Sequence, residues 1–134
     1  MSLIVDASVA VKWYLPEDGS PQAERILLSD DTLVAPELVL AEIGNAVWKR
    51  ILKKQVAEHA APQIIDRAQS AFDVLVPLLE IASTAVEMAV ALRHPIYDCF
   101  YFALAAREGS PLVTADRRLP SLGNEVGAEV RLLG

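Results

Sequence analysis

Four acidic residues stand where their carboxylates could act together. Asp6 and Asp116 each end a short apolar run, Asp98 falls in the first turn of a predicted helix, and Glu42 lies within another helix. Grouped carboxylate oxygens suit hard divalent cations such as Mg²⁺ and Mn²⁺. A bound ion of this kind can activate a water molecule for hydrolysis. The chemistry open to the chain therefore depends on whether the fold brings these four acids together.

Each acid has a structural explanation when it is taken alone. Asp6 and Asp116 could cap the helices that follow them. Asp98 could interact with a helix dipole, and Glu42 could be a solvated surface residue. Four carboxylates in one pocket, however, would repel one another by roughly 3 kcal/mol per pair at ~5 Å and an effective dielectric of about 20. A bound Mg²⁺ or Mn²⁺ would offset this repulsion, so the set as a whole favours a metal site.

Other metal-binding residue types are few. The two histidines, His59 and His94, are too few and too poorly placed for a zinc triad. Cys99 lies on a predicted core helix, where packing explains it better than a nucleophilic role. The expected site is therefore built from oxygen ligands.

Strands and helices alternate along the chain, and this pattern predicts the fold class. The expected strands are Leu3–Val5, Leu33–Ala35, Val74–Pro77, Pro111–Thr114 and Glu129–Leu133. The expected helices are Ala7–Leu15, Ser20–Leu28, Pro36–Lys54, Gln55–Phe72, Ser83–Arg93, Tyr97–Glu108 and Arg117–Leu122. Such alternation predicts an α/β fold, a three-layer α/β/α arrangement with a central parallel sheet covered on both faces. With right-handed connections, Asp6, Asp98 and Asp116 would lie at one edge of that sheet.

Three features of the predicted helices follow from single residues. Apolar residues recur at every fourth position over Val39–Ile51, and Glu42 lies off this buried stripe with Asn45 on its own side. Further on, Pro62 must either start or kink the helix expected over residues 55–72. The two alternatives for Pro62 remain open at this point. Ser20 is expected to cap its helix, with Pro21 at the first position.

Composition sets the broad class of the protein. A chain of 134 residues that is 53% hydrophobic and 22% charged predicts one domain, residues 1–134, with a substantial core. Its 12 basic against 18 acidic residues give a net charge of −6, the wrong sign for gripping nucleic acid by bulk electrostatics. The single cysteine suits a reducing compartment. The N-terminus has no signal-peptide pattern, and the apolar stretch 74–92 is interrupted by Pro77, Glu80 and Glu87. We therefore expect a cytoplasmic protein without a membrane span.

The segments around the four acids resemble those of the PIN domain. The resemblance rests on Asp6-Ala7-Ser8, Glu42 and Asn45 within Pro36–Asn45, Tyr97-Asp98 before Phe100-Tyr101, and Thr114–Arg118. More narrowly, the chain resembles VapC-type toxins of bacterial and archaeal toxin–antitoxin pairs, in order and over nearly its whole length. The Pro62 region departs from the uninterrupted helix usual in that family.

This resemblance implies a site and a reaction. The matching positions imply catalytic and Mg²⁺- or Mn²⁺-binding roles for Asp6, Glu42, Asp98 and Asp116. Supporting roles follow for Ser8 and Thr114, which match positions beside the metal, and for Asn45. The implied activity is endonucleolytic cleavage of single-stranded or structured RNA by water, which would leave a 5′-phosphate and a 3′-hydroxyl. The number of ions stays open, as does the choice of Asp98 or Asp116 as general base.

RNA contact would have to overcome the negative net charge. Arg117 and Arg118 follow Asp116 directly and are candidate RNA contacts. A second basic group ends the long helix and comprises Lys49, Arg50, Lys53 and Lys54. The helix dipole offers a structural explanation for that second group.

The resemblance also implies partners. A VapB-type antitoxin is expected to bind the Ala-rich helices that flank residues 49–72. A homodimer is also expected, with Trp48, Phe72 and the Val86/Val90 row in its interface.

Two other classes of protein compete with this interpretation. A phosphoacceptor receiver domain needs a lysine after a late strand, where this chain has Asp116, and it is discounted. A non-catalytic interaction module on the same fold, with the acids kept for structure, remains an alternative.

Overall fold

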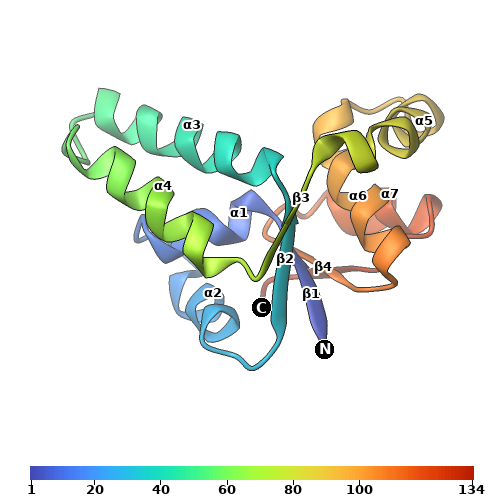
Figure 1. Ribbon diagram of the computed structural model, residues 1–134, viewed down its shortest axis with the longest axis horizontal. Coiled ribbons are helices and arrows are strands. Elements are labelled where there is room, and N and C mark those ends of the chain that lie inside the picture. Colours follow the sequence, from blue (N-terminus) through green and yellow to red (C-terminus); the bar gives the residue numbers. More distant parts are fainter.

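One parallel sheet of five strands forms the centre of the protein in a computed structural model that describes residues 1–134. The strands are β1 Ser2–Val5, β2 Thr32–Pro36, β3 Val74–Val76, β4 Leu112–Thr114 and β5 Val130–Leu132. Their order in the sheet is β3-β2-β1-β4-β5, and every neighbouring pair is parallel. The predicted α/β class with a central parallel sheet is confirmed (Figure 1).

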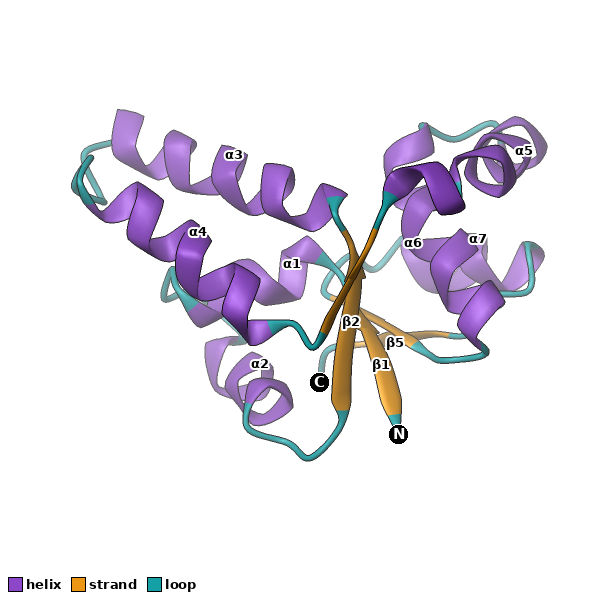
Figure 2. Ribbon diagram, in the orientation of Figure 1, coloured by secondary structure: helices purple, strands orange, loops and turns teal.

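Helices cover both faces of this sheet. They are α1 Ala7–Ala10, α2 Ser20–Leu27, α3 Leu38–Leu52, α4 Ala60–Ala71, α5 Ala82–Leu92, α6 Ile96–Glu108 and α7 Leu119–Glu125, with 3₁₀ turns η1 Val11–Trp13 and η2 Leu78–Glu80. Helices α1 to α4 lie on one side of the sheet and α5 to α7 on the other (Figure 2). The three-layer α/β/α prediction is therefore confirmed. None of the helices combines the length and the apolar character needed to cross a bilayer.

Strand β1 is buried on both faces because it lies in the middle of the sheet. Leu3 and Val5 pack in the core beneath α1 to α4, whereas Ile4 packs in the core beneath α5 to α7. This two-sided burial explains why the strand is a continuous apolar run instead of an alternating one. A polar residue is tolerated only where the strand ends, which is the position of Asp6.

The order in which strands are added to the sheet changes direction at β1. From β1 the chain builds outward through β2 and β3, and it then returns to add β4 and β5 on the other side. The register pairs Val5 with Val113. Asp6, the residue after β1, and Thr114, the last residue of β4, therefore lie side by side at the same edge of the sheet. Open α/β sheets bind ligands in the crevice beyond such a reversal.

The positions of two prolines can now be assigned: the sequence left the role of Pro62 open, and the predicted role of Pro36 was wrong. Pro62 is the third residue of α4, in a first turn where its missing N–H breaks no helical hydrogen bond. It therefore lies in the first turn of the helix and does not kink it, and residues 55–59, which we expected to be helical, form a non-helical connection before it. Pro36 ends β2, and the long helix begins two residues later at Leu38, so our prediction that Pro36 opens this helix was wrong.

The start of α2 also differs from the prediction. Gly19, with φ +89°, precedes the helix in the left-handed conformation that glycine adopts readily. The Ser20 hydroxyl instead donates to the carbonyl of Lys12 and accepts from the N–H of Glu17. Ser20 thus ties α2 to the preceding loop and is not a side-chain cap.

The aromatic and apolar residues expected at interfaces fall into two groups. Phe72 is buried and packs on Trp13, with ring centroids 5.6 Å apart, so its assignment to a dimer surface was wrong. Trp48 is 54% exposed, and Val86 and Val90 lie exposed along α5. Only the second group is accessible to a partner.

Candidate active site

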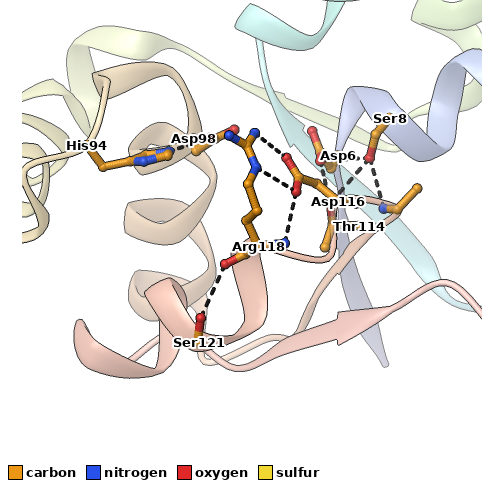
Figure 3. Close-up of polar contacts among 9 residues, drawn as sticks. Asp6, Ser8, His94, Asp98, Thr114, Asp116, Arg118 and Ser121 are labelled. Carbon is orange, nitrogen blue, oxygen red and sulfur yellow. Dashed lines mark hydrogen bonds and ion pairs between the residues drawn. The ribbon is translucent and has the colours of Figure 1, made fainter.

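Asp6 lies at the carboxyl end of the central strand and is only 6% exposed. Its Oδ2 accepts hydrogen bonds from the hydroxyls of Ser8, at 2.8 Å, and Thr114, at 2.7 Å (Figure 3). The side chain makes no hydrogen bond to the N–H groups that begin α1, so helix capping does not explain it. Burial raises the pKa of Asp6 above its ordinary value, although the hydrogen bonds from Thr114 and Ser8 act in the opposite direction.

The same two hydroxyls connect the ends of β1 and β4. Ser8 Oγ accepts the N–H of Ala115 at 2.9 Å, and Thr114 Oγ1 accepts the N–H of Asp116 at 3.0 Å. Thr114 is fully buried. The backbone that carries Asp116 is therefore fixed relative to Asp6 by two side chains from different segments.

Glu42 extends from α3 toward the same region. The hydroxyl of Tyr101, a fully buried residue of α6, donates to Glu42 Oε1 at 2.6 Å. The pKa of Glu42 is raised to about 7, mainly by burial; the hydrogen bond from Tyr101 lowers it, and the negative charges of Asp6 and Asp98 contribute to the rise. Glu42 therefore shares an electrostatic environment with these two acids.

Asp98, in the first turn of α6, is held by a residue one turn before it. His94 Nε2 lies 2.6 Å from Asp98 Oδ2, and both side chains are partly buried. The negative charge of Asp98 raises the pKa of both Asp6 and Glu42. His94 and Asp98 lie four residues apart, a spacing that brings side chains together around the first turn of a helix.

Asp116 is engaged by an arginine that follows it in the chain. Arg118 approaches through Nε at 3.1 Å from Oδ1 and Nη2 at 2.6 Å from Oδ2, and its backbone N–H donates to Oδ1 at 2.9 Å. This contact lowers the pKa of Asp116. In Figure 3 the guanidinium group lies between Asp116 and Asp98. Arg117, by contrast, is exposed and makes no ion pair.

The fold thus brings the predicted acids to one edge of the sheet, but not into one coordination sphere. With the side chains in these positions, no three His, Cys, Asp or Glu groups converge closely enough to hold a single ion. Each acid is instead held by its own partner within the chain. The donor set nevertheless fits Mg²⁺ or Mn²⁺, because it offers carboxylate oxygens whose burial and mutual repulsion disfavour ionisation without a cation.

Two functional neighbours were missed from the sequence. From the sequence, His94 is considered only as a zinc ligand, and Tyr101 is given no role in the site. Spacing offers a signal for His94, which lies four residues before Asp98, but none for Tyr101, whose partner Glu42 is 59 residues away in the sequence. Asn45, one turn after Glu42, is exposed and lines a cavity together with Ser8 and Glu42.

Comparisons with known proteins point to one family. A family model described as the PIN domain matches residues 3–125. Ribonuclease VapC3 of Pyrobaculum aerophilum is 34% identical over 123 residues, which make up 89% of this chain and 92% of that protein. Ribonuclease VapC1 of Mycobacterium tuberculosis is 31% identical over 118 residues, or 87% of this chain and 86% of that protein.

A solved structure has the same architecture. The crystal structure of PAE2754 from Pyrobaculum aerophilum superposes with a TM-score of 0.70 and 29% sequence identity. The match covers 97% of this chain and 83% of that chain. The likeness therefore extends over the whole three-layer fold and is not restricted to the acidic segments.

The raised pKa of Glu42 makes the stability of the metal-free protein depend on pH. An acid whose pKa is about 7 in the folded protein, against an ordinary 4.5, contributes stability that is fully present below pH 4.5 and lost as the pH rises through about 7. We expect the free energy of unfolding of the wild type in chelator to fall over this range relative to Glu42→Gln, which does not ionise. Urea unfolding at a series of pH values measures the difference. Parallel curves for the two proteins would show that Glu42 titrates normally.

Because Arg118 is paired with Asp116, we expect its guanidinium group to compete with a metal cation for the Asp116 carboxylate. In Arg118→Ala, Asp116 is released and a positive charge beside Asp98 is removed, so Mn²⁺ should bind several-fold more tightly. Arg117→Ala is the matched control, since it removes the same charge from a neighbouring side chain that makes no ion pair. Isothermal titration calorimetry with Mn²⁺ gives both affinities. Equal gains in the two variants would mean that only net charge matters.

Proposed function

This chain belongs to the PIN-domain family, and from that premise we propose that it is a cytoplasmic, metal-dependent endoribonuclease, the toxin of a VapBC-type toxin–antitoxin pair. The observation that carries the proposal is the buried Asp6, linked to Thr114 and placed beside three further acids, in a chain 34% identical to Ribonuclease VapC3.

We assign cation binding to the four carboxylates, Asp6, Glu42, Asp98 and Asp116. A bound Mg²⁺ or Mn²⁺ would supply Lewis-acid stabilisation of the phosphate charge and make hydroxide available near neutral pH. The protein's own part is to orient the ligands. Ser8 and Thr114 hold Asp6, and Tyr101 holds Glu42 by its hydrogen bond to Oε1.

A general base must accept the proton of the attacking water. Asp116 is the weaker candidate while Arg118 is bound to it, because that contact lowers its pKa. Asp98 is the better candidate, since His94 engages only its Oδ2, at 2.6 Å, whereas Arg118 engages both oxygens of Asp116. Attack by water on the phosphodiester then breaks the bond to the 3′-oxygen and leaves a 5′-phosphate and a 3′-hydroxyl.

RNA has to approach a protein with a net charge of −6. Arg117 is the accessible cation next to Asp116, and we propose that it contacts a phosphate of the substrate. Arg118 could do the same only after it leaves Asp116. The substrate we propose is a single-stranded or structured RNA, whose flexible backbone can reach a recessed carboxylate site.

Two protein partners belong to the proposal. A VapB-type antitoxin would bind the α3–α4 layer, where Trp48 and Leu52 are the large exposed apolar residues. A second copy of the chain would bind α5, which exposes Val86 and Val90. The two patches lie on opposite faces of the sheet, so both partners could bind at once.

Cleavage of a circular RNA tests the proposed reaction. Wild-type protein with Mg²⁺ or Mn²⁺ should open the circle, which offers no free end to an exonuclease, and chelator should abolish cleavage. Asp98→Asn should reduce the rate by orders of magnitude, because the amide neither accepts the proton nor carries the negative charge. A wild type that cleaves no RNA under these conditions would favour the non-catalytic interaction module instead.

Thermal melting of the same variant separates a ligand from a structural residue. In chelator, Asp98→Asn should melt at or above the wild type, because it removes a charge that raises the pKa of Asp6 and Glu42. Mg²⁺ should raise the melting temperature of the wild type more than that of the variant. A variant that melts lower in chelator would mean that Asp98 serves mainly to hold His94 and the start of α6.

The assembly state tests the two interfaces. Light scattering of the chain alone at tens of micromolar should give the mass of a dimer, and Val90→Glu on α5 should give a monomer. Co-expression with the neighbouring gene product should give a heavier complex with both proteins. A monomeric wild type rules out the α5 interface, and a chain that purifies alone and causes no growth arrest rules out the antitoxin.

A further inference from the structure

A groove beside the acidic site is lined mostly by residues to which the proposed reaction assigns no role. Ala41, Asn45 and Ala46 of α3 line it, together with Val11 of the 3₁₀ turn η1 and Tyr97 at the start of α6. Its volume is about 460 Å³, within the roughly 300–1,000 Å³ typical of small-ligand sites. Six of the ten lining residues are hydrophobic.

This groove is continuous with the acids. Ser8, which donates to Asp6, and Glu42 both line it. Whatever occupies the groove therefore lies immediately beside the group that the acids act upon. A substrate segment there would be adjacent to the reacting phosphate, not at a remote site.

The groups that face the groove match an unpaired nucleobase. Tyr97 is 60% exposed and offers a ring face on which a base can stack. Asn45 presents an exposed amide, which can donate to and accept from a base edge. Lys49, one turn further along α3, is exposed and makes no ion pair, so it is free to meet a phosphate.

We infer that this groove is a nucleobase subsite for the RNA strand, which stacks one base on Tyr97 next to the scissile phosphate. The inference rests on the proposed ribonuclease function and adds to it the means of selecting a sequence. Small residues at Ala41 and Ala46 leave room for a flat ring above the helix, whereas larger side chains there would fill it. Asn45 is placed to distinguish one base edge from another.

The test compares two exposed aromatic residues in RNA binding. Fluorescence anisotropy in chelator measures the affinity of a single-stranded RNA containing the sequence that the wild type cleaves. Tyr97→Ala should weaken binding by roughly 5- to 150-fold, the equivalent of about 1–3 kcal/mol for one stacked base, while Tyr97→Phe should retain it. Trp48→Ala is the matched control, because Trp48 is 54% exposed on α3 but does not line the groove. Melting temperatures confirm that the variants are folded.

Crosslinking gives a second readout that does not depend on affinity. RNA with 4-thiouridine beside the cleavage site should crosslink to Tyr97 or to residues 38–49. Unchanged affinity in Tyr97→Ala, an equal loss in Trp48→Ala, or crosslinks only elsewhere would overturn the subsite while leaving the nuclease intact. Unchanged RNA affinity with lost binding of a co-purifying protein would make the groove a protein-binding surface. A wild type that neither binds nor cleaves RNA would overturn both proposals.

Discussion

The burial of one carboxylate, Asp6, is the constraint on which the rest of the site depends. A buried carboxylate is strongly disfavoured unless hydrogen bonds or opposite charge compensate for its lost hydration. In this protein the compensation comes from Ser8 and Thr114, which belong to segments 106 residues apart in the sequence. The Ser8 hydroxyl reaches Asp6 locally, but the Thr114 hydroxyl can reach it only if β4 pairs with β1 in the observed register. The sheet order and the acidic site are thus parts of one arrangement.

The other three acids show what an acidic cluster does when each member finds a partner in its own chain. Tyr101 donates to Glu42, His94 pairs with Asp98, and Arg118 pairs with Asp116. These partners differ in how firmly they fix the carboxylate that they contact. Tyr101 is buried and rigid, whereas Arg118 has a side chain 72% exposed to solvent and can move away. Asp116 is therefore the acid most easily released to a cation, and Glu42 is the one most firmly oriented.

The local sequence pattern predicted the strands and their arrangement in a sheet, because the pattern of apolar residues reports which faces of a strand are buried. Apolar runs without alternation identified strands covered on both faces, and the residues that end β1 and β4 identified the edge where the acids lie. The pairings within the site were not predictable in this way. Tyr101 stands within a run of apolar residues on α6, and only the three-dimensional approach of α3 gives its hydroxyl a partner 59 residues away. The start of α2 was mispredicted for the same reason. Gly19, not Ser20, precedes the helix, because the Ser20 hydroxyl donates to the carbonyl of Lys12, a contact that the local pattern does not reveal.

The negative net charge has a consequence for how a nucleic acid would be recognised. Proteins that bind by neutralising many phosphates gain affinity through the release of counterions, and that affinity is largely independent of sequence. A chain with 12 basic and 18 acidic residues has little of this term, and several of its cations are already paired, including Lys12, Arg50 and Arg118. Affinity would then come mainly from contacts to bases, to which a cation bound at the proposed site would add. Such a protein would bind most RNA weakly and would act on the few sequences whose bases fit beside the carboxylates, so that the acidity of the whole chain itself favours selectivity.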